Sequence, residues 1–303
     1  MEVLKVTPRG YCKGVTRAIA IAKKTAIENP DKKVYVLGML VHNAYVMKAL
    51  SELGIYTIDD KTKNRMELLN EIPNDAIVIF TAHGISEYVK KEAIRKGLMI
   101  VDASCPDVVK TQTLVQEKEK QGYEILYIGK RNHPEAESIC YQKPHVHLIC
   151  SKEDIQQIPY YNKIFVTNQT TMSIFDVAYL FDEIKHKFPQ AEICEEICNA
   201  TRIRQEAVVN LKGQDIDVAY IVGDKYSNNS NRLAQIAKEQ GIQHVYRIDD
   251  VNDITDEQLQ NVKKVAITSG ASTPTYLTNQ VIQYLENYQI GAVKPEIIIK
   301  DVL

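Results

Sequence analysis

Short apolar runs that end in glycine recur along the chain and alternate with amphipathic segments. These runs are Val34–Gly38, Ile125–Gly129 and Ala219–Gly223. Each has the length and composition of a strand that is buried on both faces. A second set of apolar runs, each followed by a polar segment, comprises residues 77–80, 164–166 and 265–267. Because strands alternate with helices, the pattern predicts an α/β fold with parallel-type sheets.

A cysteine opens each of three repeats of this pattern. Cys12 and Cys105 are 93 residues apart, and so are Cys105 and Cys198. Each cysteine follows a short extended segment and precedes an amphipathic helix. The extended segments are Val3–Val6, Met99–Asp102 and Ala191–Ile197. The predicted helical faces are Val15, Ala18, Ile19, Ala22 and Ala26, then Val108, Leu114, Val115 and Lys118, then Ile203, Ala207, Val208 and Leu211.

Each repeat is therefore predicted to contain three strands, with a cysteine loop or a polar loop at every carboxyl end. The predicted α/β units are 13–104, 105–197 and 198–290, with the N-terminal strand in 1–12 completing the third unit and 291–303 as a C-terminal tail. In parallel sheets ligands bind beyond the carboxyl ends of strands. Three units related by a pseudo-threefold axis would bring these loops to one centre. Repeated βα units without a shared site are the alternative.

Composition and charge exclude several classes of function. Of the 303 residues, 45% are hydrophobic and 25% are charged, which is ordinary for a globular protein with a packed core. The net charge of −2 gives no basic field for nucleic acid or for an anionic membrane. The N-terminus lacks a signal peptide, and no apolar run would span a bilayer, so we expect a cytoplasmic protein. Its six cysteines are then expected to be ligands, catalysts or core residues rather than disulfides.

The spacing of the three repeated cysteines is too wide for a CxxC pair or a zinc ribbon. Each stands where a helix begins, and a helix N-terminus stabilises a thiolate. Three thiolates would leave one metal position open, as in a cubane iron–sulfur cluster with an iron free to bind substrate. Zinc held by three cysteines and a histidine is the rival, and three buried core cysteines are the remaining alternative. The other three cysteines, Cys140, Cys150 and Cys194, are predicted to be packing residues.

The polar loops carry hydroxyl, amide and imidazole groups at equivalent positions. The set comprises His42, His83, His133, Glu135, Thr170, Ser227, Asn229 and Ser272. If they converge, such donors would bind a polyanion such as a diphosphate. Neither GxxxxGK[ST] nor GxGxxG occurs, so nucleotide binding is not supported. Glu135 could supply a proton to a leaving hydroxyl, or it could be a surface glutamate beside a proline.

Nine motifs, in order from about residue 3 to 285, resemble those of the IspH (LytB) family. They are Arg-Gly-Tyr-Cys-Lys-Gly-Val at 9–15, Val-His-Asn at 41–43, Thr-Ala-His-Gly at 81–84, Asp-Ala-Ser-Cys-Pro at 102–106, His-Pro-Glu at 133–135, Gln-Thr-Thr at 169–171, Cys-Asn-Ala-Thr at 198–201 with Arg-Gln at 204–205, Ser-Asn-Asn-Ser-Asn-Arg-Leu at 227–233 and Ser-Gly-Ala-Ser at 269–272. This chain departs from the family pattern at Ser104, Asn132, Ser138, Arg202 and Ile203.

The resemblance implies three α/β units around a central [4Fe–4S] cluster with ligands Cys12, Cys105 and Cys198. The implied reaction removes the allylic hydroxyl of 4-hydroxy-3-methylbut-2-enyl diphosphate, giving isopentenyl and dimethylallyl diphosphate. Glu135 is the implied proton source, and Thr170 would orient the hydroxyl. The implied diphosphate contacts are His42, His83, His133, Ser227, Asn228, Asn229 and Ser272. An electron donor such as ferredoxin or flavodoxin is implied, and a non-catalytic metal-containing binder or sensor of a phosphorylated metabolite is the alternative.

Overall fold

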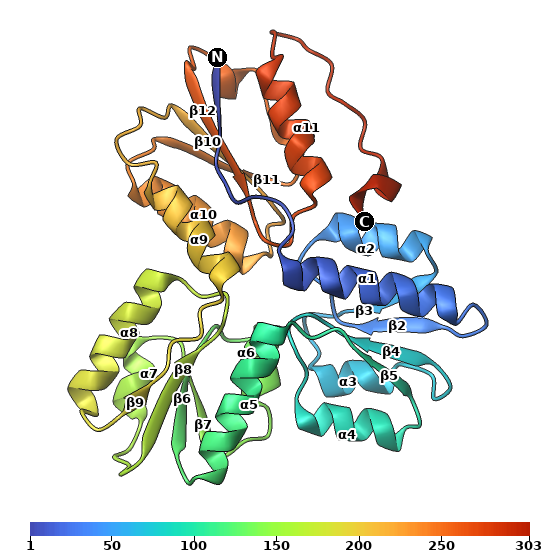
Figure 1. Cartoon of the computed structure of the whole chain (residues 1–303), viewed down its shortest axis with the longest axis vertical. Helices are drawn as coiled ribbons and strands as arrows, with labels where there is room; N and C mark the ends of the chain where they lie inside the picture. Colours follow the sequence, from blue (N-terminus) through green and yellow to red (C-terminus); the bar gives the residue numbers. More distant parts are fainter. The chain divides into compact units, whose positions relative to one another are not determined.

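The computed structural model describes residues 1–303 and contains three four-stranded sheets in which all paired strands are parallel (Figure 1). In spatial order, the first is β3 (Ile55–Ile58), β2 (Val34–Leu37), β4 (Ile77–Phe80) and β5 (Met99–Asp102). The second is β7 (Val146–Ile149), β6 (Glu124–Ile128), β8 (Ile164–Asn168) and β9 (Glu192–Ile193). The third is β1 (Glu2–Lys5), β12 (Lys264–Ser269), β10 (Val218–Val222) and β11 (His244–Ile248).

Helices connect the strands. In chain order they are α1 (Lys13–Glu28), α2 (Ala44–Glu52), α3 (Arg65–Asn70), α4 (Glu87–Arg95), α5 (Pro106–Lys120), α6 (Pro134–Cys140), α7 (Lys152–Gln157), α8 (Ile174–Lys187), α9 (Asn199–Val209), α10 (Asn228–Glu239) and α11 (Thr275–Glu286). Two short 3₁₀ helices, η1 (Val251–Asp253) and η2 (Glu257–Leu259), lie between β11 and β12, and a third, η3 (Ile299–Val302), ends the chain. None of the helices combines the length and the apolar character that crossing a bilayer requires.

The predicted α/β class with parallel sheets is confirmed, but the predicted number of strands per repeat is wrong. Each sheet has four strands rather than three. The additional strands, which the sequence pattern does not predict, are β3, β7 and β11. All three lie at a sheet edge, where one side of the strand is open and polar residues are tolerated, so β11 includes His244 and Arg247. The predicted segment Ala191–Ile197 is extended as a strand only in β9.

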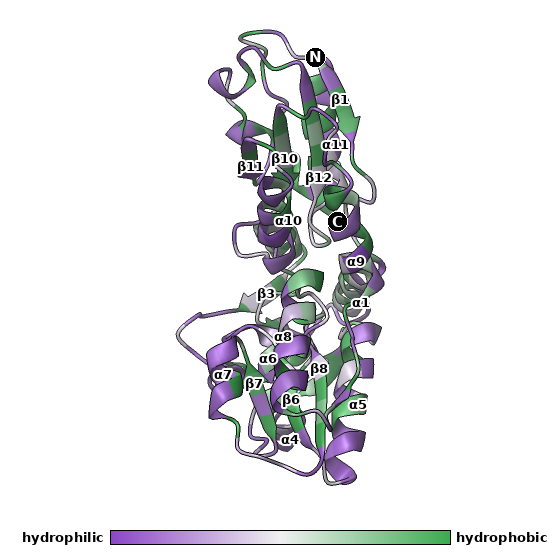
Figure 2. Cartoon of the chain, turned by 90° about the vertical axis from the view of Figure 1, so that its left-hand side faces the viewer, coloured by the Kyte–Doolittle hydropathy of each residue, from purple (hydrophilic) through white to green (hydrophobic).

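Alternation along the strands builds two apolar layers on each sheet. In β6, Ile125 and Tyr127 pack with residues of α5 and α6, whereas Leu126 and Ile128 pack with residues of α7 and α8. Helices thus cover both faces, which explains why the central strands are almost entirely apolar. Figure 2 shows this as strands coloured hydrophobic beside helices with hydrophilic outer surfaces.

The third cysteine helix buries part of the apolar face that its sequence predicts: Val208 and Leu211 are buried and Ala207 packs against the same cluster, but Ile203 is only half-buried. The fully or largely buried positions of α9 are Thr201, Arg204, Gln205 and Val208. Arg204 is accommodated because its guanidinium donates to the carbonyl oxygens of Gly10 and Ala200, at 2.8 and 2.9 Å. The buried face of α9 is therefore largely polar.

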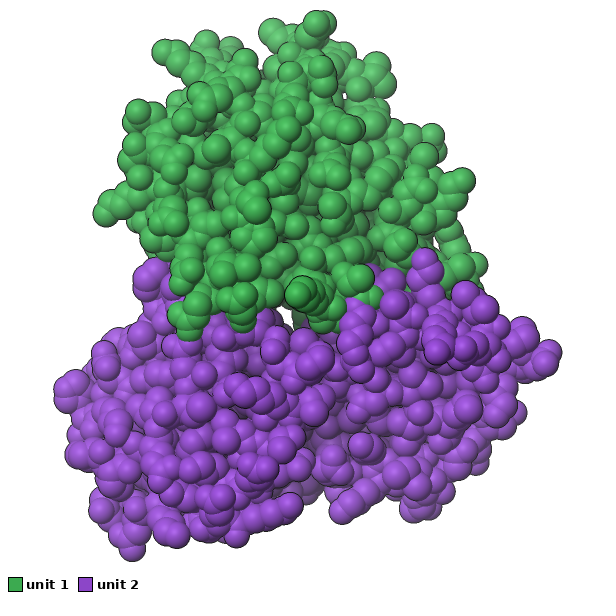
Figure 3. All heavy atoms as spheres, viewed as in Figure 1, with its two compact units in different colours: residues 1–16, 41–53, 199–303 green, residues 17–40, 54–198 purple.

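Two compact units contain these elements (Figure 3). Unit 1 comprises Met1–Thr16, Val41–Leu53 and Asn199–Leu303, and unit 2 comprises Arg17–Leu40 and Gly54–Cys198. Within unit 1, β1 pairs with β12, and the C-terminal tail ends in η3, which packs against α2 and α11. The boundaries of three separate α/β units remain a prediction.

Candidate active site

The three repeated cysteines each make the same kind of backbone hydrogen bond. Each cysteine follows an edge strand, and its backbone N–H donates to a carbonyl oxygen in the polar loop after the adjacent central strand of the same sheet. The bonds are Cys12 to Ala271, Cys105 to Ala82 and Cys198 to Thr170, each 3.0 Å long. The same polar loops carry Ser272, His83 and Thr170 itself, so each cysteine is fixed beside predicted substrate-binding residues.

Each of these cysteines also precedes a helix directly. Cys105 is the N-cap of α5, with Pro106 in the first turn, and Cys12 accepts the Thr16 N–H at 3.0 Å as α1 begins. Cys198 immediately precedes α9. All three are half-buried. Thiols at helix N-termini suit thiolate ligands, so these residues fit the sulfur donor set of a metal cluster.

Two of the three cysteines belong to unit 2, and Cys12 belongs to unit 1. In unit 2 an ion pair joins the Cys105 helix to the segment before Cys198: both Lys110–Glu196 nitrogen–oxygen distances are 2.9 Å. The Glu196 carboxylate is largely buried, and its backbone N–H donates to the Asn168 side chain at 2.9 Å. Within neither unit do three His, Cys, Asp or Glu side chains gather as a ready metal site.

The other cysteines are half-buried residues in and beside the second sheet. Cys140 and Cys194 contact the apolar cluster between β6 and α6. Burial raises the pKa of Cys140 to about 12, so this thiol stays protonated and is a poor ligand. Cys150 is a half-buried free thiol whose backbone N–H donates to Asp154.

Glu135 is the one carboxyl group among the predicted site residues, and it is almost completely buried. It lies in the first turn of α6 with 1% of its surface exposed. The Thr170 N–H donates to Oε1 at 2.7 Å, and the Thr170 hydroxyl lies 2.9 Å from Oε2. Burial raises the pKa of Glu135 to about 7, although the hydrogen bonds from Thr170 and Tyr127 favour the ionised form. A carboxyl group with this pKa can donate a proton near neutral pH.

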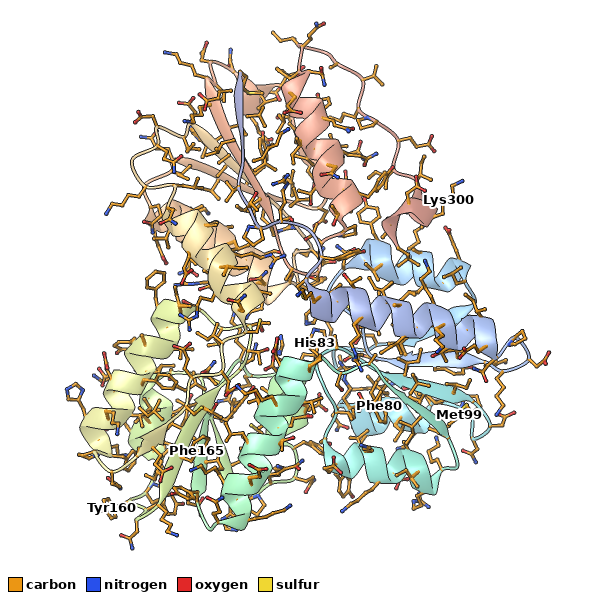
Figure 4. All side chains as sticks on the ribbon, in the orientation of Figure 1. Phe80, His83, Met99, Tyr160, Phe165 and Lys300 are labelled. Atoms are coloured by element: carbon orange, nitrogen blue, oxygen red, sulfur yellow. The ribbon has the colours of Figure 1, made fainter.

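Two predicted imidazoles lie beside this carboxyl group in unit 2. His133 is the N-cap of α6, and its Nδ1 accepts the Glu135 N–H at 3.2 Å, which places the proton of a neutral ring on Nε2. The His83 ring packs edge-on against His133, with centroids 5.7 Å apart. Figure 4 shows His83 beyond the carboxyl end of β4, at the opposite end of the first sheet from Met99. Unit 2 therefore brings together His83, His133, Glu135 and Thr170.

In unit 1, contacts to the third sheet fix the loop of His42. The Ser272 hydroxyl donates to the His42 carbonyl oxygen at 3.0 Å. The next residues begin α2, where the Ala44 N–H donates to Asp224 at 3.1 Å and the Tyr45 hydroxyl bonds to Asp250. His42 and Ser272 are therefore adjacent.

The remaining predicted residues lie at the start of α10 in unit 1. Ser227 is the N-cap and accepts the Ser230 N–H at 3.3 Å. Asn228 is half-buried in the first turn. Asn229 is buried, yet neither its Oδ1 nor its Nδ2 has a hydrogen-bond partner. A buried amide in this state points to a polar ligand, because buried polar groups are rarely left without a partner.

The model of the LytB protein family matches residues 3–286. The chain belongs to the LytB family. It is 50% identical over 292 residues to the 4-hydroxy-3-methylbut-2-enyl diphosphate reductase of Anoxybacillus flavithermus, an alignment covering 95% of this chain and 91% of that protein. The solved E-1-hydroxy-2-methyl-but-2-enyl-4-diphosphate reductase from Plasmodium falciparum is 34% identical with a TM-score of 0.87, covering 94% of this chain and 88% of that one. A second solved (E)-4-hydroxy-3-methyl-but-2-enyl diphosphate reductase is 29% identical with a TM-score of 0.68, covering 95% and 100%.

Two departures from the LytB pattern have a local explanation. Asn132 has φ of 61°, in the left-handed region that glycine favours and asparagine tolerates. Ser138 is buried, donates to the Glu135 carbonyl oxygen at 2.7 Å and accepts from Gln112 at 2.9 Å. Gln112 also donates to Ile85 at 3.1 Å, so Ser138 helps to link α6 with α5 and the His83 loop.

Sequence reasoning about the LytB site missed Tyr127. This residue of β6 is completely buried, and its hydroxyl lies 3.3 Å from Glu135 Oε1. The available signal was a single tyrosine in the aliphatic run 125–128, because a buried tyrosine hydroxyl usually requires a hydrogen-bond partner.

Proposed function

We propose that this chain is a reductase that removes the allylic hydroxyl of 4-hydroxy-3-methylbut-2-enyl diphosphate, giving isopentenyl and dimethylallyl diphosphate. The observation that carries the proposal is the buried Glu135–Thr170 pair beside His83 and His133. Family membership and the names of the relatives support the same reaction.

Cys12, Cys105 and Cys198 would hold a [4Fe–4S] cluster, one per chain. Their placement at three helix N-termini, with equivalent backbone contacts, supports this role. When bound, such a cluster supplies electrons and one open iron that acts as a Lewis acid. A small one-electron protein of the ferredoxin or flavodoxin type is the proposed donor.

The proposed diphosphate site consists of hydroxyl, amide and imidazole groups, which are neutral or cationic hydrogen-bond donors. His133 carries its ring proton on Nε2 when neutral, and Asn229 has a buried amide without a partner. With these we group His42, His83, Ser227, Asn228 and Ser272. The Ser272 hydroxyl donates to the His42 carbonyl oxygen, so donating to a phosphate oxygen instead would require this hydroxyl to rotate.

Glu135 would supply the proton that turns the hydroxyl into water, and Thr170 would orient that hydroxyl. With two electrons and two protons, the alcohol becomes an alkene and one water molecule. We expect Glu135→Gln to reduce turnover at least about 100-fold, which is the lower range for loss of a general acid. Near-wild-type turnover would contradict this assignment.

The test uses anaerobically purified protein. We expect about four iron and four sulfide per chain, and dithionite-driven turnover of the allylic diphosphate. Colourless protein that contains zinc would favour a metal-containing binder. Loaded protein that binds the diphosphate without turnover would favour a sensor. Glu135→Gln should retain the iron, the sulfide and diphosphate binding.

A further inference from the structure

Tyr127 places a phenol against the proposed proton donor from inside the core. Its ring packs in the cluster of β6, α5 and α6, with Val115 and Ile139 among the neighbours. Its hydroxyl lies 3.3 Å from Glu135 Oε1. Burial, together with the nearby carboxyl group, raises the pKa of Tyr127 well above its ordinary value. The phenol therefore remains protonated near neutral pH and can donate.

The two oxygens of Glu135 have different surroundings. Oε1 faces two donors, the Thr170 N–H at 2.7 Å and the Tyr127 hydroxyl at 3.3 Å. Oε2 accepts a hydrogen bond from the Thr170 hydroxyl at 2.9 Å. An amide N–H cannot accept a hydrogen bond, whereas a hydroxyl both donates and accepts. A proton on Oε1 could be accepted only by the Tyr127 hydroxyl, whose own proton would then lose its acceptor, whereas a proton on Oε2 points at the Thr170 hydroxyl.

We infer that Tyr127 is a positioning residue for Glu135, which with the Thr170 N–H keeps Oε1 as an acceptor and directs the transferable proton to Oε2. This inference rests on the proposed function for its catalytic consequence. The chain path explains why Tyr127, Glu135 and Thr170 meet: β6 carries Tyr127, leads into the loop before α6 and runs beside β8 (Figure 1).

The proton then has a defined route. Oε2 gives its proton to Thr170 Oγ1, whose own proton passes to the substrate hydroxyl oxygen. The carbon–oxygen bond breaks, and the oxygen leaves as water. Two electrons come from the external donor, and a second proton from elsewhere is added to carbon. Glu135 is left as a carboxylate and is reprotonated from solvent between turnovers.

The other groups that face Glu135 do not replace Tyr127. Asp107 on α5 raises the pKa of Glu135 through its negative charge. His133 accepts the Glu135 backbone N–H and does not bond to the carboxyl group through Nδ1. Thr170 follows β8 and supplies the other two contacts. Tyr127 is thus the side-chain donor that distinguishes Oε1 from Oε2.

Tyr127→Phe tests the inference, with Tyr220→Phe as the matched control. Tyr220 is an equally buried tyrosine of a central strand, and its hydroxyl donates to Gln258 at 2.9 Å. Both variants remove one hydroxyl from a core ring. We expect Tyr127→Phe to lower kcat about five-fold with little change in KM, because one donor to an ionisable group is lost. The alkaline limb of its kcat profile should move to higher pH, because Tyr127 favours the ionised carboxylate.

A second measurement does not depend on turnover. Infrared difference titration of wild-type protein against Glu135→Gln reports the carboxylic acid band of Glu135 directly. In Tyr127→Phe this band should persist to higher pH, whereas in Tyr220→Phe it should titrate as in the wild type. If wild-type protein showed no turnover, the proposed function would fail while this titration still tested Tyr127. If Tyr127→Phe matched Tyr220→Phe in the titration, the inference would be overturned.

Discussion

The Glu135 carboxyl group is almost inaccessible to water, and this determines how its charge affects the folded chain. Its pKa rises from an ordinary 4.5 to about 7, mainly through burial. A general acid must hold its proton, so we expect turnover to fall as the pH rises through about 7. A profile of kcat against pH checks this expectation. A flat profile up to pH 9 would contradict it.

The same raised pKa predicts a pH-dependent cost in stability. Below about pH 4.5 the carboxyl is protonated in both folded and unfolded chains, so it imposes no electrostatic cost. Between about pH 4.5 and about 7 the unfolded chain ionises at this residue while the folded chain keeps the proton, so stability is lost across this window and the loss is complete above it. Glu135→Gln removes this cost, because a glutamine oxygen can accept at Oε1 while its NH₂ donates to Thr170.

We therefore expect Glu135→Gln to be more stable than the wild type at pH 8, by roughly 3 kcal/mol, and about equal at pH 4. Denaturant unfolding at both pH values measures the difference. Glu153→Gln is the control, since Glu153 is exposed and its pKa is lowered by hydrogen bonds. An equal effect at both pH values would show that the gain does not arise from ionisation.

At the scale of elements, the ends of β10 and β12 pack tightly against the first turn of α10, where Gly223 and Gly270 contact Ser230. The Ser230 hydroxyl is buried without a partner, and a Cβ added to Gly270 would lie 2.1 Å from its Oγ. We expect Gly270→Ala to destabilise unit 1 by about 2 kcal/mol through overpacking. Ser230→Ala should restore most of the loss, because the nearest remaining atoms would then be 3.3 Å away.

Gly223 provides the contrasting case. Its added Cβ would lie 2.8 Å from the Ser230 Cβ as well as 2.1 Å from Oγ. Ser230→Ala should therefore not rescue Gly223→Ala. Denaturant unfolding of the two single glycine variants and the two double variants measures this asymmetry. Equal rescue at both glycines would show that the backbone yields at this contact.

The elements also show how far the sequence could predict the fold and the site. Central strands such as β4 were recognisable because helices cover both faces and the residues are all apolar. Edge strand β11 was not, because its exposed side admits charge. The cysteine and histidine loops were found from repeated spacing. Tyr127 was not found, because its role depends on β6 lying beside β8, and pairing between distant segments is not encoded in local periodicity.

At the scale of the whole molecule, unit 1 is assembled from three separate stretches of the chain, and its C-terminal tail contacts all of them. The Tyr11 hydroxyl donates to the Val302 carbonyl oxygen at 2.8 Å, and η3 packs on α2 and α11. Gln280 in α11 donates to the Glu296 carbonyl oxygen at 2.9 Å. Val302 is only 2% exposed. The tail therefore ties the loop that carries Cys12 to the rest of unit 1.

Deleting residues 296–303 should therefore loosen unit 1 and leave unit 2 unchanged. Loss of the Val302 side chain and two hydrogen bonds should cost about 3 kcal/mol. Hydrogen exchange should accelerate at Cys12 and in α2, but not in β6. Lys300→Ala is the control, because this exposed side chain can be removed while the tail backbone remains (Figure 4). Faster exchange in β6 as well would mean that the tail stabilises the fold as a whole, because a purely local tie would leave the second sheet protected.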